Sequence, residues 1–363
     1  MILLSIHSSP SLALLLYSSR VSDLWEQVDW AALDRMRERF LELTAGQADY
    51  WESESHLLSY DQTFAQRVAW KWDFVGEQLK RRGWTPPSAP VLDWGCGTGV
   101  ANRSFLRAFP DLISQGLQVY DRSAPAMAYA EQRAQSVFES IQVKSWVPET
   151  GATGVVLLSH VVTELSETQL TELLQALASA AAIIWVEPGT VAASRQLIAA
   201  RDRLRTTHHL VAPCLHSMEC GLNAPSRAHD WCHHFASPPP EVFTSPHWAA
   251  FAKLLGIDLR SLPLSYLVLD KRPPTPLPEG SVRVLGRPRV YKAHALALGC
   301  DAAGVEESRV SKRNLPELFR SAKKGKFESQ QVWKREGIEI VADGSSSSGA
   351  PSSSADVSEA DAS

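Results

Sequence analysis

Three of the five cysteines in this 363-residue chain, Cys214, Cys220 and Cys232, fall within nineteen positions, and Cys300 follows far downstream. Thiolates are soft ligands, and four of them bind Zn²⁺ tetrahedrally or hold an iron–sulfur cluster. Zinc ribbons use C-x₂-C pairs, in which two residues separate the cysteines. Here five residues separate Cys214 from Cys220, and eleven separate Cys220 from Cys232. This spacing favours ligands from separate loops around a bulkier cluster. Four histidines in the same stretch keep a Cys/His zinc site open.

Two other interpretations fit the same thiols. Free cysteine is among the most buried residue types, so scattered core thiols are one alternative. The polar surroundings, rich in Pro and His, argue against it. The tripeptide APC, ending at Cys214, also matches the catalytic Pro-Cys of cytosine-C5 methyltransferases, in which a thiolate adds to the ring. That chemistry would leave Cys220 and Cys232 without a role.

A glycine-rich stretch, VLDWGCGTG, follows an apolar run and precedes an amphipathic segment. Glycines at a strand-to-helix junction take positive φ and let the backbone approach a ligand. No Gly-Lys-Ser/Thr follows, so the loop is not a P-loop. The spacing of Asp93, Gly95, Gly97 and Gly99 resembles the S-adenosylmethionine-binding loop of class I methyltransferases. Asp121 ends the next apolar run, where an acid accepts ribose hydroxyls. Tight helix–strand packing without a ligand is the alternative.

The methyltransferase resemblance implies a cofactor pocket bounded by the glycine loop and Asp121, with Ser159 and His160 as its floor. It supplies no catalytic residue, because SHVVTEL replaces the Asn/Asp-Pro-Pro-Tyr/Phe motif of amino-group methyltransferases. His160 or Glu164 could act as a base, although polar residues lining the cleft are the simpler interpretation. Cys96 is most simply a small loop residue rather than a catalytic thiol.

Hydrophobic periodicity indicates an α/β protein. Residues 21–82 repeat apolar residues every three or four positions and predict helices, which TPPSAP ends. From Val91 onwards, short apolar runs alternate with amphipathic segments, a pattern typical of βαβ units and a parallel sheet. We expect a Rossmann-like, class I methyltransferase-type sheet of seven strands behind a helical N-terminal region. Residues 206–240 and 281–325 would form a cysteine-rich metal or cluster lobe.

Composition excludes several classes of protein. With 44% hydrophobic and 21% charged residues and a net charge of −4, the chain has material for a core and is not a wholly basic nucleic-acid binder. No apolar run of about 18 residues predicts a membrane span. Five cysteines argue against a secreted disulfide framework, so we expect a reducing compartment. The opening residues 1–20 fit either a weak organellar transit peptide or an over-extended start.

The C-terminal third has a local basic excess. Residues 281–340 carry thirteen basic and seven acidic side chains, a balance of +6. Such charge suits phosphate contacts, and four interleaved aromatic residues could stack on exposed bases. A solvated helix face is the alternative. The residues that we expect to contact RNA are Arg287, Arg289, Lys292, Lys312, Arg313, Lys323 and Lys324.

Several motifs taken in order resemble one family. VEPGT, AARDRL, HLVAPCLHSMEC, DWCHHF, GRPRVYKAHALALGC and SKR, within residues 60–325, are similar to the methyltransferase-like small-ribosomal-subunit assembly family, which comprises the mitochondrial small-subunit factor and its bacterial relatives. The resemblance implies that Cys214, Cys220, Cys232 and Cys300 ligate a [4Fe–4S] cluster. The Ser-rich tail lies outside it.

The resemblance also implies a function. The expected protein binds S-adenosylmethionine, carries the cluster and binds small-subunit rRNA during ribosome assembly and translation, as a free monomer with no membrane partner. An active rRNA methyltransferase with a structural zinc or cluster site is the alternative. A radical enzyme is disfavoured, because it needs a compact C-x₃-C-x₂-C loop. We expect a bacterial cytoplasmic protein, or alternatively one of the mitochondrial matrix.

The expected organisation has seven segments. They are an uncertain leader (1–20), a helical region (21–85), the first part of the methyltransferase-like domain (86–205), a cysteine-rich segment (206–240), remaining sheet strands with the distal cysteine (241–300), a basic region (301–340) and a disordered acidic, Ser-rich tail (341–363).

Overall fold

The computed structural model describes residues 25–41, 51, 53–148 and 151–344. The expected leader and residues 345–363 of the expected tail lie outside this part. The described chain divides into two compact units. The first runs to Pro276 and includes Ala302–Gly304, and the second comprises Leu277–Asp301 and the residues from Val305 onwards.

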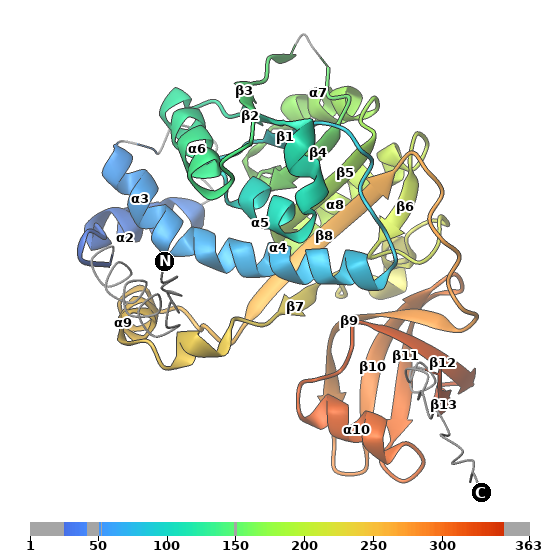
Figure 1. The fold of residues 1–363 in the computed structure, drawn as a ribbon. Coiled ribbons are helices and arrows are strands. Elements are labelled where there is room, and N and C mark those ends of the chain that lie inside the picture. The colour runs from blue at the N-terminus through green and yellow to red at the C-terminus, as the bar shows by residue number, and fades with distance from the viewer. Residues whose placement is uncertain (1–24, 42–50, 52, 149–150, 345–363) are drawn as a thin grey trace, which may run out of the picture. The chain divides into compact units, whose positions relative to one another are not determined.

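The first unit combines helices with one mixed sheet (Figure 1). Its described helices are α2 (Trp30–Leu41), α3 (Glu54–Gln62), α4 (Phe64–Arg81), α5 (Val100–Ala108), α6 (Ala124–Val137), α7 (Glu167–Leu177), α8 (Val191–Leu204) and α9 (Pro246–Leu255). Its strands are β1 (Val91–Trp94), β2 (Leu117–Tyr120), β3 (Val143–Ser145), β4 (Val155–Ser159), β5 (Ala182–Pro188), β6 (His209–Ala212), β7 (His234–Ala236) and β8 (Leu262–Asp270).

The strand order of the sheet is β3-β2-β1-β4-β5-β8-β6, and β7 pairs with β8 outside this path. The first five strands are parallel, whereas β8 runs antiparallel to both β5 and β6. Strands β5 and β6 therefore run in the same direction, with the reversed β8 between them. This arrangement is typical of the class I methyltransferase sheet. The expected α/β class is confirmed, with one strand more than the seven expected.

The central strands are apolar on both faces because helices cover both. In β4, Val155 and Leu157 pack into one core, whereas Val156 and Leu158 pack into the other. Figure 1 shows α4, α5 and α6 over one face and α7 and α8 over the other. Continuous apolar runs are expected for parallel strands buried in this way. Helix α7 on the second face begins at a capping box formed by Ser166 and Gln169.

The second unit is a closed five-stranded barrel with one helix. Its elements are β9 (Ser281–Val290), β10 (His294–Asp301), β11 (Gly304–Ser311), α10 (Pro316–Lys323), β12 (Gln330–Glu336) and β13 (Glu339–Asp343). The strand order β10-β11-β13-β12-β9 closes on itself, with β11 and β13 parallel. Its core joins Val284 and Trp333 to Leu318 and Phe319 of α10.

The barrel differs from the sequence interpretation in two ways. We placed residues 281–300 with the sheet, but β9 and β10 are barrel strands. The expected tail overlaps β13, which ends at Asp343. None of the described helices is long and apolar enough to cross a membrane.

Candidate functional site

The glycine loop joins β1 to α5 at the carboxyl end of the parallel strands. Gly95, Gly97 and Gly99 all have positive φ, at 71°, 49° and 74°, which side chains with a Cβ adopt at a cost. The loop is fixed to the end of β2, because Gly95 N donates to Tyr120 O at 2.8 Å and Gly97 N donates to Asp121 Oδ2 at 2.9 Å. These hydrogen bonds fix the loop beside Asp121 at the carboxyl ends of β1 and β2.

Two of the predicted cofactor residues act from beneath the loop. Asp93 is fully buried, and its Oδ2 accepts hydrogen bonds from Asn102 N and Nδ2 at 3.3 and 2.8 Å. Burial raises the pKa of Asp93 to about 7, against the effect of those hydrogen bonds. Gly99 begins α5, and a Cβ there would lie 3.0 Å from Ala130 Cβ. These residues support the loop rather than face the ligand.

A cavity of about 720 Å³ opens above the loop. The other four predicted cofactor residues, Gly95, Gly97, Asp121 and Ser159, all line it, as do His160 and Glu164. Helix α4, from the N-terminal region, supplies the opposite side with Arg67, Lys71 and Val68. The cavity thus spans the carboxyl end of the sheet and the helix packed beside it.

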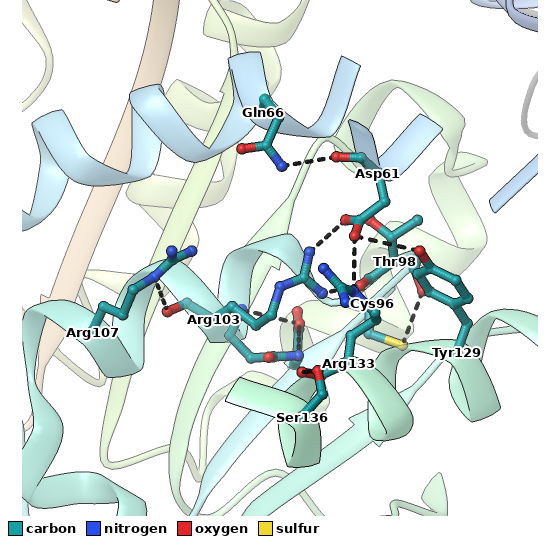
Figure 2. A network of polar contacts seen from close by, with 12 residues as sticks. Asp61, Gln66, Cys96, Thr98, Arg103, Arg107, Tyr129, Arg133 and Ser136 are labelled. Carbon is teal, nitrogen blue, oxygen red and sulfur yellow. Dashed lines mark hydrogen bonds and ion pairs between the residues drawn. The ribbon is translucent and has the colours of Figure 1, made fainter. Parts of the chain in front are cut away.

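A buried carboxylate, Asp61 at the end of α3, ties the N-terminal helices to this loop (Figure 2). It forms an ion pair with Arg103 of α5, accepts from Arg133 Nε at 3.1 Å, and contacts Tyr129 OH at 3.4 Å. Arg103 also donates to the carbonyl of Thr98, inside the glycine loop, at 2.5 Å. Asp61 and Arg103 therefore position the loop through its backbone, which the sequence interpretation missed.

Lys71 and His160 meet at the floor of the cavity. Lys71 Nζ lies 3.4 Å from His160 Nε2, and Trp72 Nε1 donates to the neighbouring Ser159 Oγ at 3.0 Å. Burial lowers the pKa of Lys71 to about 7, and the charge of Arg67 acts in the same direction. Burial, with the charges of Lys71 and Arg67, lowers the pKa of His160 well below its usual value. Near neutral pH the imidazole is uncharged and the amine is poised to titrate.

One glutamate lies beneath the polar floor and a second lines the cavity. Glu187, fully buried at the end of β5, accepts from Val161 N and Val162 N at 3.0 and 2.9 Å and from Trp185 Nε1 at 2.6 Å. These bonds fix the turn after His160, which has a positive φ of 58°. Burial raises the pKa of Glu187 and of Glu164, in each case to about 7. Glu164 is the acid of this pair that lines the cavity.

The cysteines are distributed over both units. Cys214 Sγ accepts from Arg201 Nε at 3.3 Å, whereas Cys232 Sγ lies 3.8 Å from His234 Nε2. Cys300 is half-buried on β10 of the barrel. Within the described residues, no three His, Cys, Asp or Glu side chains are grouped so as to hold a metal ion. The two parts of the expected cysteine-rich lobe belong to different units, residues 206–240 to the first and most of residues 281–325 to the second.

Neither thiol considered for catalysis is suited to it. Cys214 does not line the cavity, so it is not placed as a Pro-Cys nucleophile there. Cys96 does line the cavity, but burial raises the pKa of its thiol well above the usual value. A protonated thiol is a poor nucleophile, which agrees with a structural role for Cys96 in the loop.

The seven basic residues expected at RNA all lie in the barrel unit. Arg287 and Arg289 are on β9, and Arg289 forms an ion pair with Glu307. Lys292 lies in the β9–β10 loop, and Lys312 and Arg313 follow β11. Lys323 ends α10 and Lys324 caps it. All seven are exposed.

The strand order, the glycine loop after β1 and the acid after β2 define the first unit as a class I methyltransferase-like domain. The chain belongs to the Rsm22 family, described as mitochondrial small ribosomal subunit Rsm22, whose sequence model matches residues 77–330. This confirms the methyltransferase-like small-subunit family that the cysteine blocks suggested. A search among curated proteins finds no match.

Solved structures with a similar fold are distant. A putative RNA methyltransferase from Pyrococcus horikoshii is 9% identical, with 58% of this chain and 85% of that chain covered and a TM-score of 0.34. A putative O-methyltransferase from Nostoc punctiforme is 15% identical, with 64% and 68% covered and a TM-score of 0.35. A plantazolicin methyltransferase in complex with SAH is 14% identical, with 71% and 100% covered and a TM-score of 0.32. The fold assignment rests on strand order rather than on these scores.

Replacing Lys71 by Met should change how stability depends on pH. The unfolded chain keeps the Lys proton to about pH 10.4, whereas the folded amine loses it near pH 7, so Lys71 makes the wild-type free energy of unfolding rise with pH between these values. The stability gap between Lys71→Met and wild type should therefore shift by about 3 kcal/mol, in favour of the wild type, from pH 7 to 10. Urea unfolding at several pH values measures it. Lys80→Met, at an exposed position on the same helix, is the control, and a gap that is constant with pH would contradict the prediction.

Replacing Asp61 by Asn should loosen the glycine loop as well as destabilise the fold. Removing one partner of a buried ion pair costs about 3 kcal/mol, because the remaining charges are left uncompensated. Amide hydrogen exchange at Gly97 and Thr98 should accelerate beyond that of the sheet. Asp270→Asn is the matched control, since Asp270 is a buried acid bound by Arg272 and Trp84 at the amino end of β5, the end of the sheet opposite the glycine loop. Equal exchange at the loop in both variants would show that Asp61 has no special link to it.

Proposed function

We propose that this chain is an S-adenosylmethionine-binding factor that associates with the small ribosomal subunit and its rRNA during assembly. The observation that carries the proposal is the family match over residues 77–330, which includes the glycine loop and most of the barrel. The cavity over that loop supports the cofactor part of the proposal. The family description favours the mitochondrial matrix over the bacterial cytoplasm as the location. We propose a monomer in the free state.

The residues around the cavity fit the cofactor. A Cβ at Gly97 would lie 3.7 Å from Trp51 Cζ2, so the glycine keeps open a space that a larger residue would fill. Gly95 and Gly97 would let the main chain approach the ligand, and Asp121 would accept hydroxyl groups of its ribose. Ser159, held by Trp72, would form the floor. Bound S-adenosylmethionine supplies an electrophilic methyl group.

An active rRNA methyltransferase is the second candidate, favoured by one observation. Glu164 and Lys71 both line the cavity, and both have a pKa of about 7. A base works best when its pKa lies near the working pH, so either group could accept a proton from a nucleotide in the cavity. If the protein is instead a binding factor, Glu164 and Lys71 are only polar groups that line the ligand site, and binding alone is the function.

A [4Fe–4S] cluster held by Cys214, Cys220, Cys232 and Cys300 remains a proposal from the family resemblance. The described side chains are not arranged as a metal site, and burial raises the pKa of Cys220. One contact suits a metal-bound sulfur at Cys214, because the buried Arg201 donates from Nε to Cys214 Sγ at 3.3 Å. Zinc held by the same thiols and neighbouring histidines is the alternative.

We propose that exposed basic residues of the barrel unit contact the rRNA. They are Arg287, Arg289, Lys292, Lys312, Arg313, Lys323 and Lys324. Their charge would neutralise phosphates, so affinity for the subunit should fall as salt rises.

The variant Gly97→Arg should abolish S-adenosylhomocysteine binding measured by calorimetry, because the new side chain would fill the cavity. Gly83→Arg is the control, since Gly83 also has a positive φ (69°) and no atom lies within 4 Å of its Cβ position. Binding retained in Gly97→Arg would place the cofactor elsewhere.

The same variant separates the two candidate functions. Normal subunit assembly together with loss of an rRNA methyl mark in Gly97→Arg would favour the enzyme over the binding factor.

Anaerobically purified protein should show a broad brown absorbance with about four irons and four sulfides per chain. Cys214→Ser and Cys220→Ser should each remove most of that absorbance and weaken co-sedimentation with the small subunit. Cys96→Ser is the matched control, because Cys96 lies in the glycine loop and is not one of the four proposed cluster ligands, so the absorbance should be unchanged. A colourless protein with one zinc would overturn the cluster in favour of a structural zinc site.

A further inference from the structure

The barrel has the connectivity of an oligonucleotide-binding (OB) fold. Its strands, taken in chain order as one to five, close in the order two, three, five, four, one, with α10 between the third and fourth. OB folds use the face of strands two and three and the adjoining loops to bind oligonucleotides. Because a fold does not prove a function, the side chains of this unit must carry the inference.

Two loops of the barrel come together at one corner. Lys312 N, after β11, donates to Ala293 O, in the β9–β10 loop, at 2.9 Å. Tyr291 N donates to His294 O at 2.8 Å and closes the β9–β10 turn. The rings of Tyr291 and His294 stack with centroids 4.8 Å apart and planes 18° from parallel. A flat, two-ring platform therefore lies beside the start of the β11–α10 loop.

Tyr291 differs from the other aromatic residues of this region. The sequence offers four of them for stacking on bases, in residues 281–340. Phe319 and Trp333 are 6% and 3% exposed and Phe327 packs against the same core, so these three hold the barrel together. Tyr291 is 48% exposed. It is the one of the four with a ring open to a ligand.

The cations at this corner differ from three arginines elsewhere on the barrel. Four lysines, 323, 324, 326 and 334, are likewise exposed with no ion pair to any other described residue, so the stacked rings beside the cations are what distinguish the corner. Arg289, Arg309 and Arg335 are each engaged by an acid. Lys292 and the pair 312–313 are exposed, and no ion pair joins them to any other described residue. Their charge is thus available to an external anion.

We propose that this corner, formed by Tyr291, His294, Lys292, Lys312 and Arg313, binds single-stranded RNA. An unpaired base stacks on the Tyr291 ring, and the three cations neutralise the flanking phosphates. An exposed ring beside unpaired cations favours an unpaired strand, because bases inside a duplex are stacked on one another and unavailable to the ring. The inference rests on the proposed rRNA association. It narrows the proposed contact from seven basic residues to three, Lys292, Lys312 and Arg313, and adds the rings of Tyr291 and His294.

Fluorescence anisotropy with the full chain and a labelled twelve-nucleotide oligouridylate tests the corner. Tyr291→Ala should weaken binding roughly tenfold, whereas Tyr291→Phe keeps the ring and should bind within about twofold of wild type. Lys312→Gln with Arg313→Gln should weaken binding and reduce the slope of log affinity against log salt by about 1.4. Lys326→Gln with Lys334→Gln removes the same charge from the barrel and should leave both values unchanged. The unfolding midpoint of each variant verifies its fold.

Three outcomes would overturn the proposal. Equal affinity for a duplex of the same length would exclude single-strand recognition. An equal loss of affinity in the Lys312→Gln/Arg313→Gln and Lys326→Gln/Lys334→Gln variants would indicate a general attraction of the polyanion to the barrel. Normal binding by Tyr291→Ala would remove the stacking site. Two further measurements on the same variants test the proposed function separately from the corner. They are calorimetry with S-adenosylhomocysteine and co-sedimentation with the small subunit. Cofactor binding and subunit association can both persist in a variant that no longer binds oligouridylate.

Discussion

The buried carboxylate of Asp61 is the interaction on which the architecture around the cavity depends. It receives charge-assisted hydrogen bonds from Arg103 of α5 and Arg133 of α6. Taking these charges out of water is costly, and only mutual pairing compensates the cost. The charges of Arg103 on α5 and Arg133 on α6 are therefore compensated by α3 when it packs against them. Helix α4 follows α3 directly, and its residues line one side of the cavity. The N-terminal helices are part of the site rather than an appendage.

A second constraint lies at the end of β4. His160 has a backbone conformation that is uncommon for a residue with a Cβ, and such strain persists only where surrounding contacts enforce it. Glu187 provides that enforcement through the two amides after His160, and the buried Lys71 contacts the imidazole. Buried titratable groups of both signs reduce stability in an ordinary core. Their concentration at one cavity, where burial brings the pKa of Lys71 and of Glu164 to about 7, is typical of a ligand-binding or proton-transfer site.

The sequence revealed the parts of the site that depend on local order. Glycine spacing and the acid after β2 predicted a loop whose positive φ values and Asp121 contact the structure contains. Lys71 was missed because a lysine in an amphipathic helix usually faces water. Its spacing between Val68 and Val75, on the apolar stripe, was the available signal. The barrel was missed because it closes by pairing β11 with β13 across an intervening helix and strand, a non-local contact that periodicity does not encode.

The two units divide the chemistry between them. All residues that line the cavity belong to the first unit, and the stacked rings and unpaired cations belong to the second. Each unit has its own hydrophobic core, and the link between β8 and β9, KRPPTPLPEG, holds four prolines that cannot continue a helix. Arg272 anchors the start of the link through Asp270 and the carbonyl of Thr85. Because neither core supplies residues to the other unit's proposed site, the proposed cofactor binding and the proposed RNA contact are physically separable.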